Sequence, residues 1–187
     1  MTTKIQLLTI ADWDAMPCED GYRYEIIEGE LFVSEWPGLT HQVVLGDLTT
    51  LVAKSLIAKP IGTAVLNPPV VLSNYTGVIP DLVFFSNEQR GTIVKDDRLN
   101  GPPTLVGEIL SPGSSNIRRD RVAKLQLYGK HGVPEYWIID LKNTAVERYV
   151  NQGSSMILQE TLGKEETLTT PTLPGFSCRV SDIFSHF

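Results

Sequence analysis

The chain has 187 residues, of which 42% are hydrophobic and 20% are charged, and this composition is typical of a globular protein. We therefore expect residues 1–187 to form a single domain whose core needs no disulfide for stability. The net charge of −6 argues against a protein that binds nucleic acid through a broad basic surface, but it leaves room for a basic patch around an acidic metal site.

The sequence also indicates a cytoplasmic protein with no membrane partner. The first residues lack the apolar segment of a signal peptide, and no run approaches the roughly 18 apolar residues of a membrane helix. Cys18 and Cys178 lie at opposite ends of the chain and outside any metal-binding spacing. Two free thiols are therefore favoured over a disulfide that would join the termini.

The N-terminal third predicts a helix, a hairpin and a second helix. A capping-box pattern that begins at Thr9 opens a short helix. Two β-rich runs, 22–27 and 30–33, flank a tight turn that contains glycine, which indicates a hairpin. Apolar residues at helical spacing follow Thr40, which we expect to cap a helix that ends near Lys59.

The middle of the chain predicts two further strands. Residues 65–72 form a β-rich run that Pro68 and Pro69 interrupt, so we expect an edge strand or a bulged strand there. Residues 82–85 are apolar and predict a short buried strand. Residues 86–103 are polar and contain glycine and proline, and we expect them to be mostly loop.

A strand, a helix and a strand are predicted next. The apolar runs 105–110 and 135–140 enclose a segment with helical spacing, which is capped within 114–116 and ends near Lys130. Because a helix joins the two strands, we expect them to pair in parallel through a right-handed crossover.

Strands at 145–150 and 156–161 and a short helix at 182–184 complete the prediction. The fold class is α/β (α+β), with a central mixed sheet flanked by helices, an N-terminal β-hairpin and C-terminal β additions. Since uncovered strand edges invite partners, we expect a homodimer that forms through residues 145–161.

Two carboxylates occur at apolar strands. Glu108 lies inside the run 105–110, and a buried glutamate needs a metal, lysine or arginine nearby. The alternatives are that Glu108 forms a structural salt bridge or that it lies at an exposed strand end. Asp81 opens the strand 82–85, where the alternative is a turn residue. If neighbouring strands bring both acids to one edge of a sheet, a cation must separate them, and Mg²⁺ or Mn²⁺ suits such oxygen ligands.

The helix that follows Glu108 supplies positive charge. Helical spacing places Lys124 beside Ile117, Leu127 and Tyr128, on the face expected to pack against the sheet. From there its ammonium group could reach a catalytic centre, although a lysine in such a position usually extends to water. Three arginines of the same helix could contact phosphates or form a solvated face: Arg118, Arg119 and Arg121.

Several short motifs are spread over nearly the whole chain. They are 24–31 (YEIIEGEL), 78–84 (VIPDLVF), 105–112 (LVGEILSP), 120–125 (DRVAKL), 132–140 (GVPEYWIID) and 173–176 (LPGF). Together they resemble the Uma family of restriction-endonuclease-like nucleases, formerly a domain of unknown function, which is assigned to the PD-(D/E)xK nuclease superfamily.

The resemblance implies a restriction-endonuclease-like fold and locates its active site. Pro80 and Asp81 match the PD of the motif, and Glu108 matches its second acid. The chain departs from the pattern at Leu110, where the motif has lysine. Lys124 lies on the next helix and resembles a lysine that replaces the motif lysine from a different position in the sequence.

The activity implied by the resemblance is that of a divalent-metal-dependent endonuclease that hydrolyses phosphodiester bonds, with DNA as the substrate. Asp81, Glu108 and the backbone carbonyl of Ile109 would hold Mg²⁺ or Mn²⁺, and Lys124 would assist hydrolysis. Four further residues match accessory positions of the family: Glu25, His41, Gln42 and Asp120. The alternative is a catalytically inactive protein of the same fold that acts as a binding or assembly module, which the missing lysine and the net charge of −6 favour.

Overall fold

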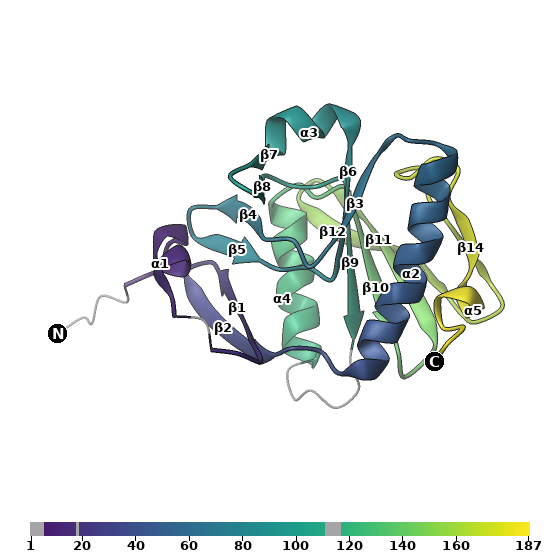
Figure 1. The fold of residues 1–187 in the computed structure, drawn as a ribbon, viewed down its shortest axis with the longest axis horizontal. Coiled ribbons are helices and arrows are strands. Elements are labelled where there is room, and N and C mark those ends of the chain that lie inside the picture. Colours follow the sequence, from purple (N-terminus) through teal and green to yellow (C-terminus); the bar gives the residue numbers. More distant parts are fainter. Residues whose placement is uncertain (1–5, 18, 111–116) are drawn as a thin grey trace.

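A computed structural model of the chain describes residues 6–17, 19–110 and 117–187, except for the side chains of residues 117–120. Its two large helices lie on opposite sides of a twisted sheet, and a second sheet extends from one side of that core (Figure 1). The helices are α1 (Ile10–Ala15), α2 (Leu39–Ala58), α3 (Asn87–Ile93), α4 (Ile117–Lys130) and α5 (Val180–Ile183).

The strands form two six-stranded sheets and one two-stranded sheet. The central sheet has the order β12-β11-β10-β9-β6-β3, and the second has the order β2-β1-β5-β4-β8-β7. The strands are β1 (Tyr22–Ile27), β2 (Glu30–Glu35), β3 (Gly62–Leu66), β4 (Val70–Ser73), β5 (Thr76–Val78), β6 (Leu82–Ser86), β7 (Val94–Lys95), β8 (Arg98–Asn100), β9 (Leu105–Leu110), β10 (Glu135–Asp140), β11 (Ala145–Gln152), β12 (Ser155–Leu162), β13 (Thr167–Thr169) and β14 (Ser177–Arg179).

The central sheet confirms the predicted strand–helix–strand unit. Strands β9 and β10 pair in parallel, with Glu108 opposite Ile138, and α4 connects them. Strand β6 pairs antiparallel with the other edge of β9, so Leu82 lies opposite Gly107. Strands β6, β9 and β10 are therefore neighbours in one sheet, and β9 lies between the other two.

Each face of the central sheet carries its own apolar core, because successive side chains of a strand point to opposite faces. On one face, α2 and the C-terminal segment pack on residues such as Phe84 and Trp137. On the other face, Leu127 and Tyr128 of α4 pack with Ile138 and with strands of the second sheet. The second sheet and α4 therefore enclose one face of β6 and β9 together.

The N-terminal hairpin forms as predicted but belongs to the second sheet. Thr9 caps α1 with a complete capping box, and β1 pairs antiparallel with β2. The turn between these strands uses Glu28 at φ 52° and Gly29 at φ 82°, the left-handed conformation that a two-residue hairpin turn requires. The ladder between β1 and β5 pairs Ile26 with Gly77. Hydrogen bonds from the Gly29 amide to the Tyr75 carbonyl (2.8 Å) and from the Glu28 amide to Thr76 Oγ1 (3.2 Å) also join the hairpin to the larger sheet.

Two predictions for the middle of the chain were wrong. Residues 86–103 are not mostly loop: they contain α3, β7 and β8, and α3 begins with a capping box between Ser86 and Gln89. The run 65–72 is two strands and not one interrupted strand, because Pro68 and Pro69 separate β3 and β4, which lie in different sheets. The expected edge and bulge do occur, since β3 is an edge strand and the register of β4 shifts between Val71 and Ser73.

Smaller differences concern helix ends. Gly38, not Thr40, is the N-cap residue of α2, so that helix begins at Leu39. The last helix is α5, which begins two residues before the predicted position, and the pair β13–β14 was not predicted. The cap expected within 114–116 and Cys18 lie outside the described residues, whereas Cys178 is a buried free thiol. None of the helices described is both long and apolar enough to cross a membrane.

Candidate active site

Asp81 and Glu108 come together because β6 and β9 are antiparallel neighbours. The register pairs Leu82 with Gly107, so the next step along the ladder places Asp81 beside Glu108. Both residues are buried, with exposed fractions of 1% and 4%. Two acids that β6, α3, β7 and β8 separate in the sequence therefore share one buried position at the start of β6.

Asp81 is held on both carboxylate oxygens. Its Oδ2 accepts hydrogen bonds from the backbone amide of Ile109 (2.8 Å) and from His41 Nε2 (3.0 Å). Its Oδ1 accepts one from Arg23 Nη1 (3.2 Å). Burial by itself raises the pKa of Asp81, but the hydrogen bond and charge of His41, together with Arg23 and the Ile109 amide, outweigh burial and lower this pKa to about 2. Asp81 is therefore ionised throughout the neutral range.

Glu108 has a different environment. Its Oε1 accepts hydrogen bonds from Lys124 Nζ (2.7 Å) and Tyr128 Oη (2.9 Å). Burial raises the pKa of Glu108 to about 7, and the charge of Asp81 adds to this rise, while Lys124 opposes it. Adjacent carboxylates thus have pKa values far apart, which is characteristic of sites that bind protons or cations.

Lys124 faces the sheet, as its helical position predicts. Its Nζ also lies 3.8 Å from Glu25 Oε1, and only 11% of its side chain is exposed. Burial alone would lower the pKa of Lys124, but the charges of Glu108 and Glu25 outweigh it and raise this pKa above its ordinary value. Lys124 is therefore a buried, protonated cation one turn before Tyr128.

Strand β1 supplies two further charged groups. Glu25 and Arg23 are two residues apart, so their side chains point to the same face of the strand. Glu25 Oε1 accepts a hydrogen bond from the backbone amide of Ile79 (2.8 Å), and Arg23 Nη1 donates one to the carbonyl of Ile79 (3.0 Å). The hairpin thereby clamps the backbone just before Pro80. Arg23 was not identified from the sequence, although its alternation with Glu25 was the available signal.

The other candidates divide between this cluster and its surroundings. His41 is part of the cluster, whereas Gln42, the next residue of α2, is exposed. Arg121 forms an ion pair with Glu147 of β11, which also accepts a hydrogen bond from Tyr149 Oη (2.6 Å). The side chains of three candidates lie outside the described residues: Arg118, Arg119 and Asp120.

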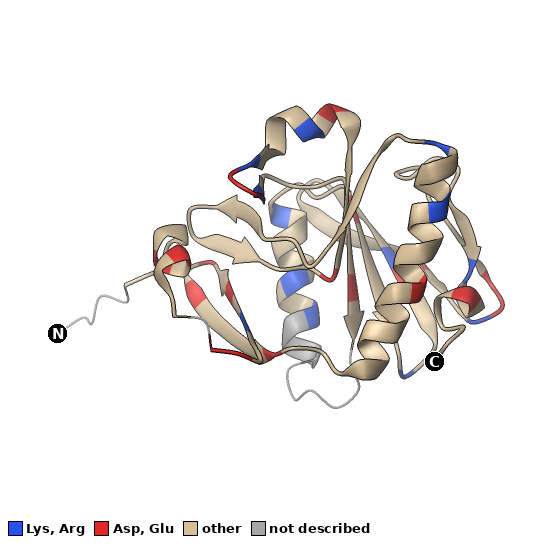
Figure 2. Ribbon diagram, viewed as in Figure 1, with Lys and Arg blue, Asp and Glu red and all other residues tan. Residues whose placement is uncertain are grey.

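The oxygen donors for a metal at this cluster are few. Across the described ranges, no group of three or more His, Cys, Asp and Glu side chains is arranged to hold a metal ion. Asp81 and Glu108 are two adjacent carboxylates, and the backbone of Ile109 lies beside Asp81. Figure 2 shows basic positions along α4 in blue opposite acidic positions on the central strands in red.

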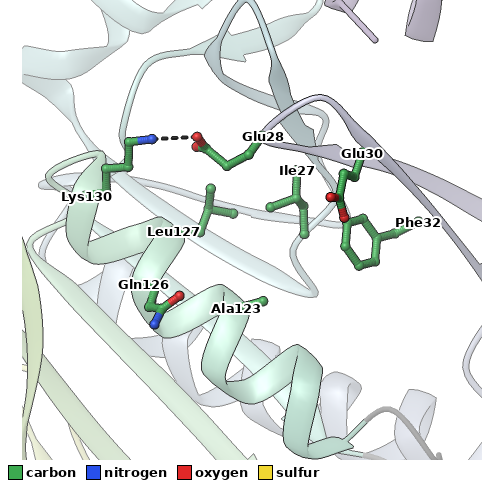
Figure 3. A pocket seen from close by; sticks show the side chains of 8 residues that line it. All are labelled: Ile27, Glu28, Glu30, Phe32, Ala123, Gln126, Leu127 and Lys130. Atoms are coloured by element: carbon green, nitrogen blue, oxygen red, sulfur yellow. Dashed lines mark hydrogen bonds and ion pairs between the residues drawn. The ribbon is translucent and has the colours of Figure 1, made fainter. Parts of the chain in front are cut away.

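A groove of about 430 Å³ lies between the hairpin and α4 (Figure 3). It is lined by Ile27, Glu28, Glu30, Phe32, Ala123, Gln126, Leu127 and Lys130. Lys130 Nζ donates a hydrogen bond to Glu28 Oε2 (2.5 Å) across it. The groove was not predicted from the sequence, and it separates the two elements that carry Glu25 and Lys124.

Comparisons with known proteins agree with this fold. A family model, Uma2, described as "Putative restriction endonuclease", matches residues 10–181. The structure is similar to the crystal structure of a protein from Anabaena variabilis described as a "putative nuclease belonging to DUF820". The TM-score is 0.75 at 20% sequence identity, over 95% of this chain and 98% of that one. No curated protein matches the chain.

Proposed function

The chain belongs to the Uma2 family of restriction-endonuclease-like proteins, and on this premise we propose that it is a divalent-metal-dependent endonuclease that hydrolyses phosphodiester bonds in DNA. One observation carries the proposal. Asp81, Glu108 and Lys124 come from three separate segments and meet in one buried cluster, where Lys124 Nζ lies 2.7 Å from Glu108 Oε1. Two acids could hold a divalent metal and a lysine could stabilise the charge that develops on a phosphate, so the three groups suit metal-assisted phosphodiester hydrolysis.

The donor set fits Mg²⁺ or Mn²⁺. These ions prefer oxygen ligands, and Mg²⁺ commonly binds one or two carboxylates and completes its shell with water and phosphate oxygens. Asp81, Glu108 and the carbonyl of Ile109 would hold the ion. No described residue donates a hydrogen bond to Glu108 Oε2, so that oxygen is free to bind a cation. A dication would also offset the repulsion between the two carboxylates.

When bound, the metal would lower the pKa of a coordinated water and polarise the scissile phosphate. The protein's own groups have separate tasks. His41 and the Ile109 amide fix the orientation of Asp81, and Tyr128 does the same for Glu108. Lys124 is positioned to stabilise the negative charge that develops on the phosphate or to orient the attacking water.

A second candidate is a catalytically inactive protein that keeps the fold as a binding or assembly module. The observation that favours it is that both acids already have a cationic partner: Arg23 lies 3.2 Å from Asp81, and Lys124 lies 2.7 Å from Glu108. In this reading the cluster is a structural ion-pair network, which agrees with Leu110 at the place of the motif lysine.

A plasmid cleavage assay separates the two candidates. Wild-type protein should nick or linearise supercoiled DNA with Mg²⁺ or Mn²⁺ and not with EDTA. Glu108→Gln should lose at least about 100-fold of this activity, the scale for the loss of one preorganised electrostatic group. Glu135→Gln is the matched control, because Glu135 is equally buried but interacts with other groups. Folded wild-type protein that shifts DNA in a gel and never cleaves it would favour the binding module.

A further inference from the structure

The cluster contains a second buried cation that the nuclease motif does not include. We propose that Arg23 is a substrate-contacting residue, which binds the scissile phosphate from the Asp81 side of the cluster while Lys124 acts from the Glu108 side. The inference rests on the proposed function and deepens it. Three observations support it: the donors that Arg23 leaves unused, its exposure relative to its neighbours, and the charge balance of the site.

Arg23 has hydrogen-bonding capacity that the protein does not use. Its Nη1 donates to the carbonyl of Ile79 and to Asp81 Oδ1, whereas its buried Nε finds no acceptor among the described residues. A guanidinium carries five N–H donors in a planar fork that matches two phosphate oxygens, and an unpaired buried donor is unfavourable. A phosphate that reached this guanidinium would satisfy the unpaired donor.

The two cations are the parts of the cluster nearest to solvent. The side chains of Arg23 and Lys124 are each 11% exposed, compared with 2% for Asp81, 3% for His41, 6% for Glu108 and 8% for Glu25. A substrate that approaches Asp81 and Glu108 therefore meets both cations before these two acids. They project from β1 and α4, the elements that flank the groove in Figure 3.

The charge balance assigns the same role to Arg23. Asp81, Glu108 and Glu25 bring three negative charges when ionised, and Arg23 and Lys124 bring two positive ones. The cluster then lacks one positive charge if His41 is neutral and is balanced if His41 is protonated. A bound dication would therefore leave an excess of one or two positive charges, which complements a phosphodiester anion. Because the dication and Arg23 would both bind the carboxylate of Asp81, Asp81 would neutralise less of the guanidinium charge. The guanidinium could then attract the phosphodiester anion.

The test measures DNA binding and metal binding without catalysis. A fluorescently labelled DNA duplex is titrated in Ca²⁺ over a range of salt concentrations, and Mn²⁺ binding is measured by calorimetry. Arg23→Gln should weaken DNA binding about tenfold or more and reduce the slope of log K against log salt by about 1, while Mn²⁺ binds at least as tightly as before. Arg98→Gln is the control, since it removes an arginine whose ion pair with Asp14 is more exposed; its binding should match wild type.

The outcomes separate this inference from the proposed function. If Arg23→Gln keeps the wild-type DNA affinity and salt slope, or if it loses Mn²⁺ binding, Arg23 only supports Asp81. Either result would overturn the inference about Arg23, while the proposed cleavage of plasmid DNA could still stand. If Arg23→Gln fails to fold, Arg23→Lys decides: it keeps the charge without the planar fork, so weaker DNA binding is expected and wild-type binding overturns the inference. A wild-type protein that neither binds nor cleaves DNA overturns both proposals.

Discussion

Replacing Lys124 by methionine should destabilise the protein in a strongly pH-dependent way. The change keeps most of the apolar stem but removes the ammonium group 2.7 Å from Glu108 Oε1. A buried carboxylate that loses its partner costs roughly 3–5 kcal/mol when it stays ionised. Glu108 can avoid this cost by binding a proton, since burial already raises its pKa to about 7 with Lys124 in place.

The direction of this pH dependence follows from the linkage between proton binding and folding. In wild-type protein the pKa of Glu108 in the folded state, about 7, exceeds the ordinary value of 4.5, so the folded protein binds this proton more tightly than the unfolded chain. The stability that proton binding contributes is fully present below the ordinary pKa and is lost as pH rises to about 7. Without Lys124 the folded pKa rises further, and the loss continues above pH 7. At about 1.4 kcal/mol per pH unit, Lys124→Met should lose about 2 kcal/mol more at pH 8.5 than near pH 7.

Chemical denaturation in metal-free buffer at pH 6 and pH 8.5 measures this difference. Lys130→Met is the matched control, because Lys130 lies on the same helix and its ion pair with Glu28 is exposed; that variant should stay within about 1 kcal/mol of wild type at both pH values. At about pH 7, below the range of the extra stability loss, DNA cleavage by Lys124→Met should fall at least about 100-fold relative to wild type. Equal stability losses at both pH values would refute the reasoning about Glu108, and wild-type cleavage would remove Lys124 from the mechanism.

Three further outcomes are expected. Mn²⁺ affinity, measured by calorimetry, should rise by up to about tenfold per pH unit up to about pH 7 and then level off, because Glu108 must lose its proton; affinity that is flat from pH 5 to 8 would contradict this. Glu135→Gln should cost about 1–3 kcal/mol in thermal unfolding, since Glu135 accepts hydrogen bonds from Trp137, Thr170 and Thr172; an unchanged melting temperature would argue against that network. Light scattering should give twice the 20.7 kDa monomer mass, with Ile157→Lys on the free edge of β12 restoring the monomer; a monomeric wild type would end this proposal.

Three adjacent strands of the central sheet, β6, β9 and β10, could be predicted because they are largely apolar runs of five or six residues. A single acid in such a run, as at Glu108, is conspicuous in a sequence, because burial of an isolated charge is unfavourable. The second sheet gave no such signal. Several of its strands have only two to four residues, and β1 joins β5 through one residue pair, so its pairing depends on tertiary packing that no local pattern records.

The candidate site was predictable in part for a geometric reason. Glu108 and Lys124 lie on regular elements whose apolar neighbours indicate the buried face, and Asp81 directly precedes such a strand, whereas Glu25 and His41 were expected only from the resemblance to the family. Consecutive residues of a helix point about 100° apart, so His41 and Gln42 cannot both face the same site, and the sequence did not decide between them. Arg23 was missed because strand alternation relates it to Glu25 but does not say which face of β1 is buried against α4.

An anomalous difference map from crystals grown with Mn²⁺ tests the central claim most directly. We expect one strong peak between Asp81 and Glu108, at about 2.1 Å from a carboxylate oxygen of each and from the carbonyl of Ile109, with Lys124 still at hydrogen-bonding distance from Glu108. Crystals at saturating Mn²⁺ in which both carboxylates keep only their Arg23 and Lys124 partners and no peak lies between them would contradict this claim.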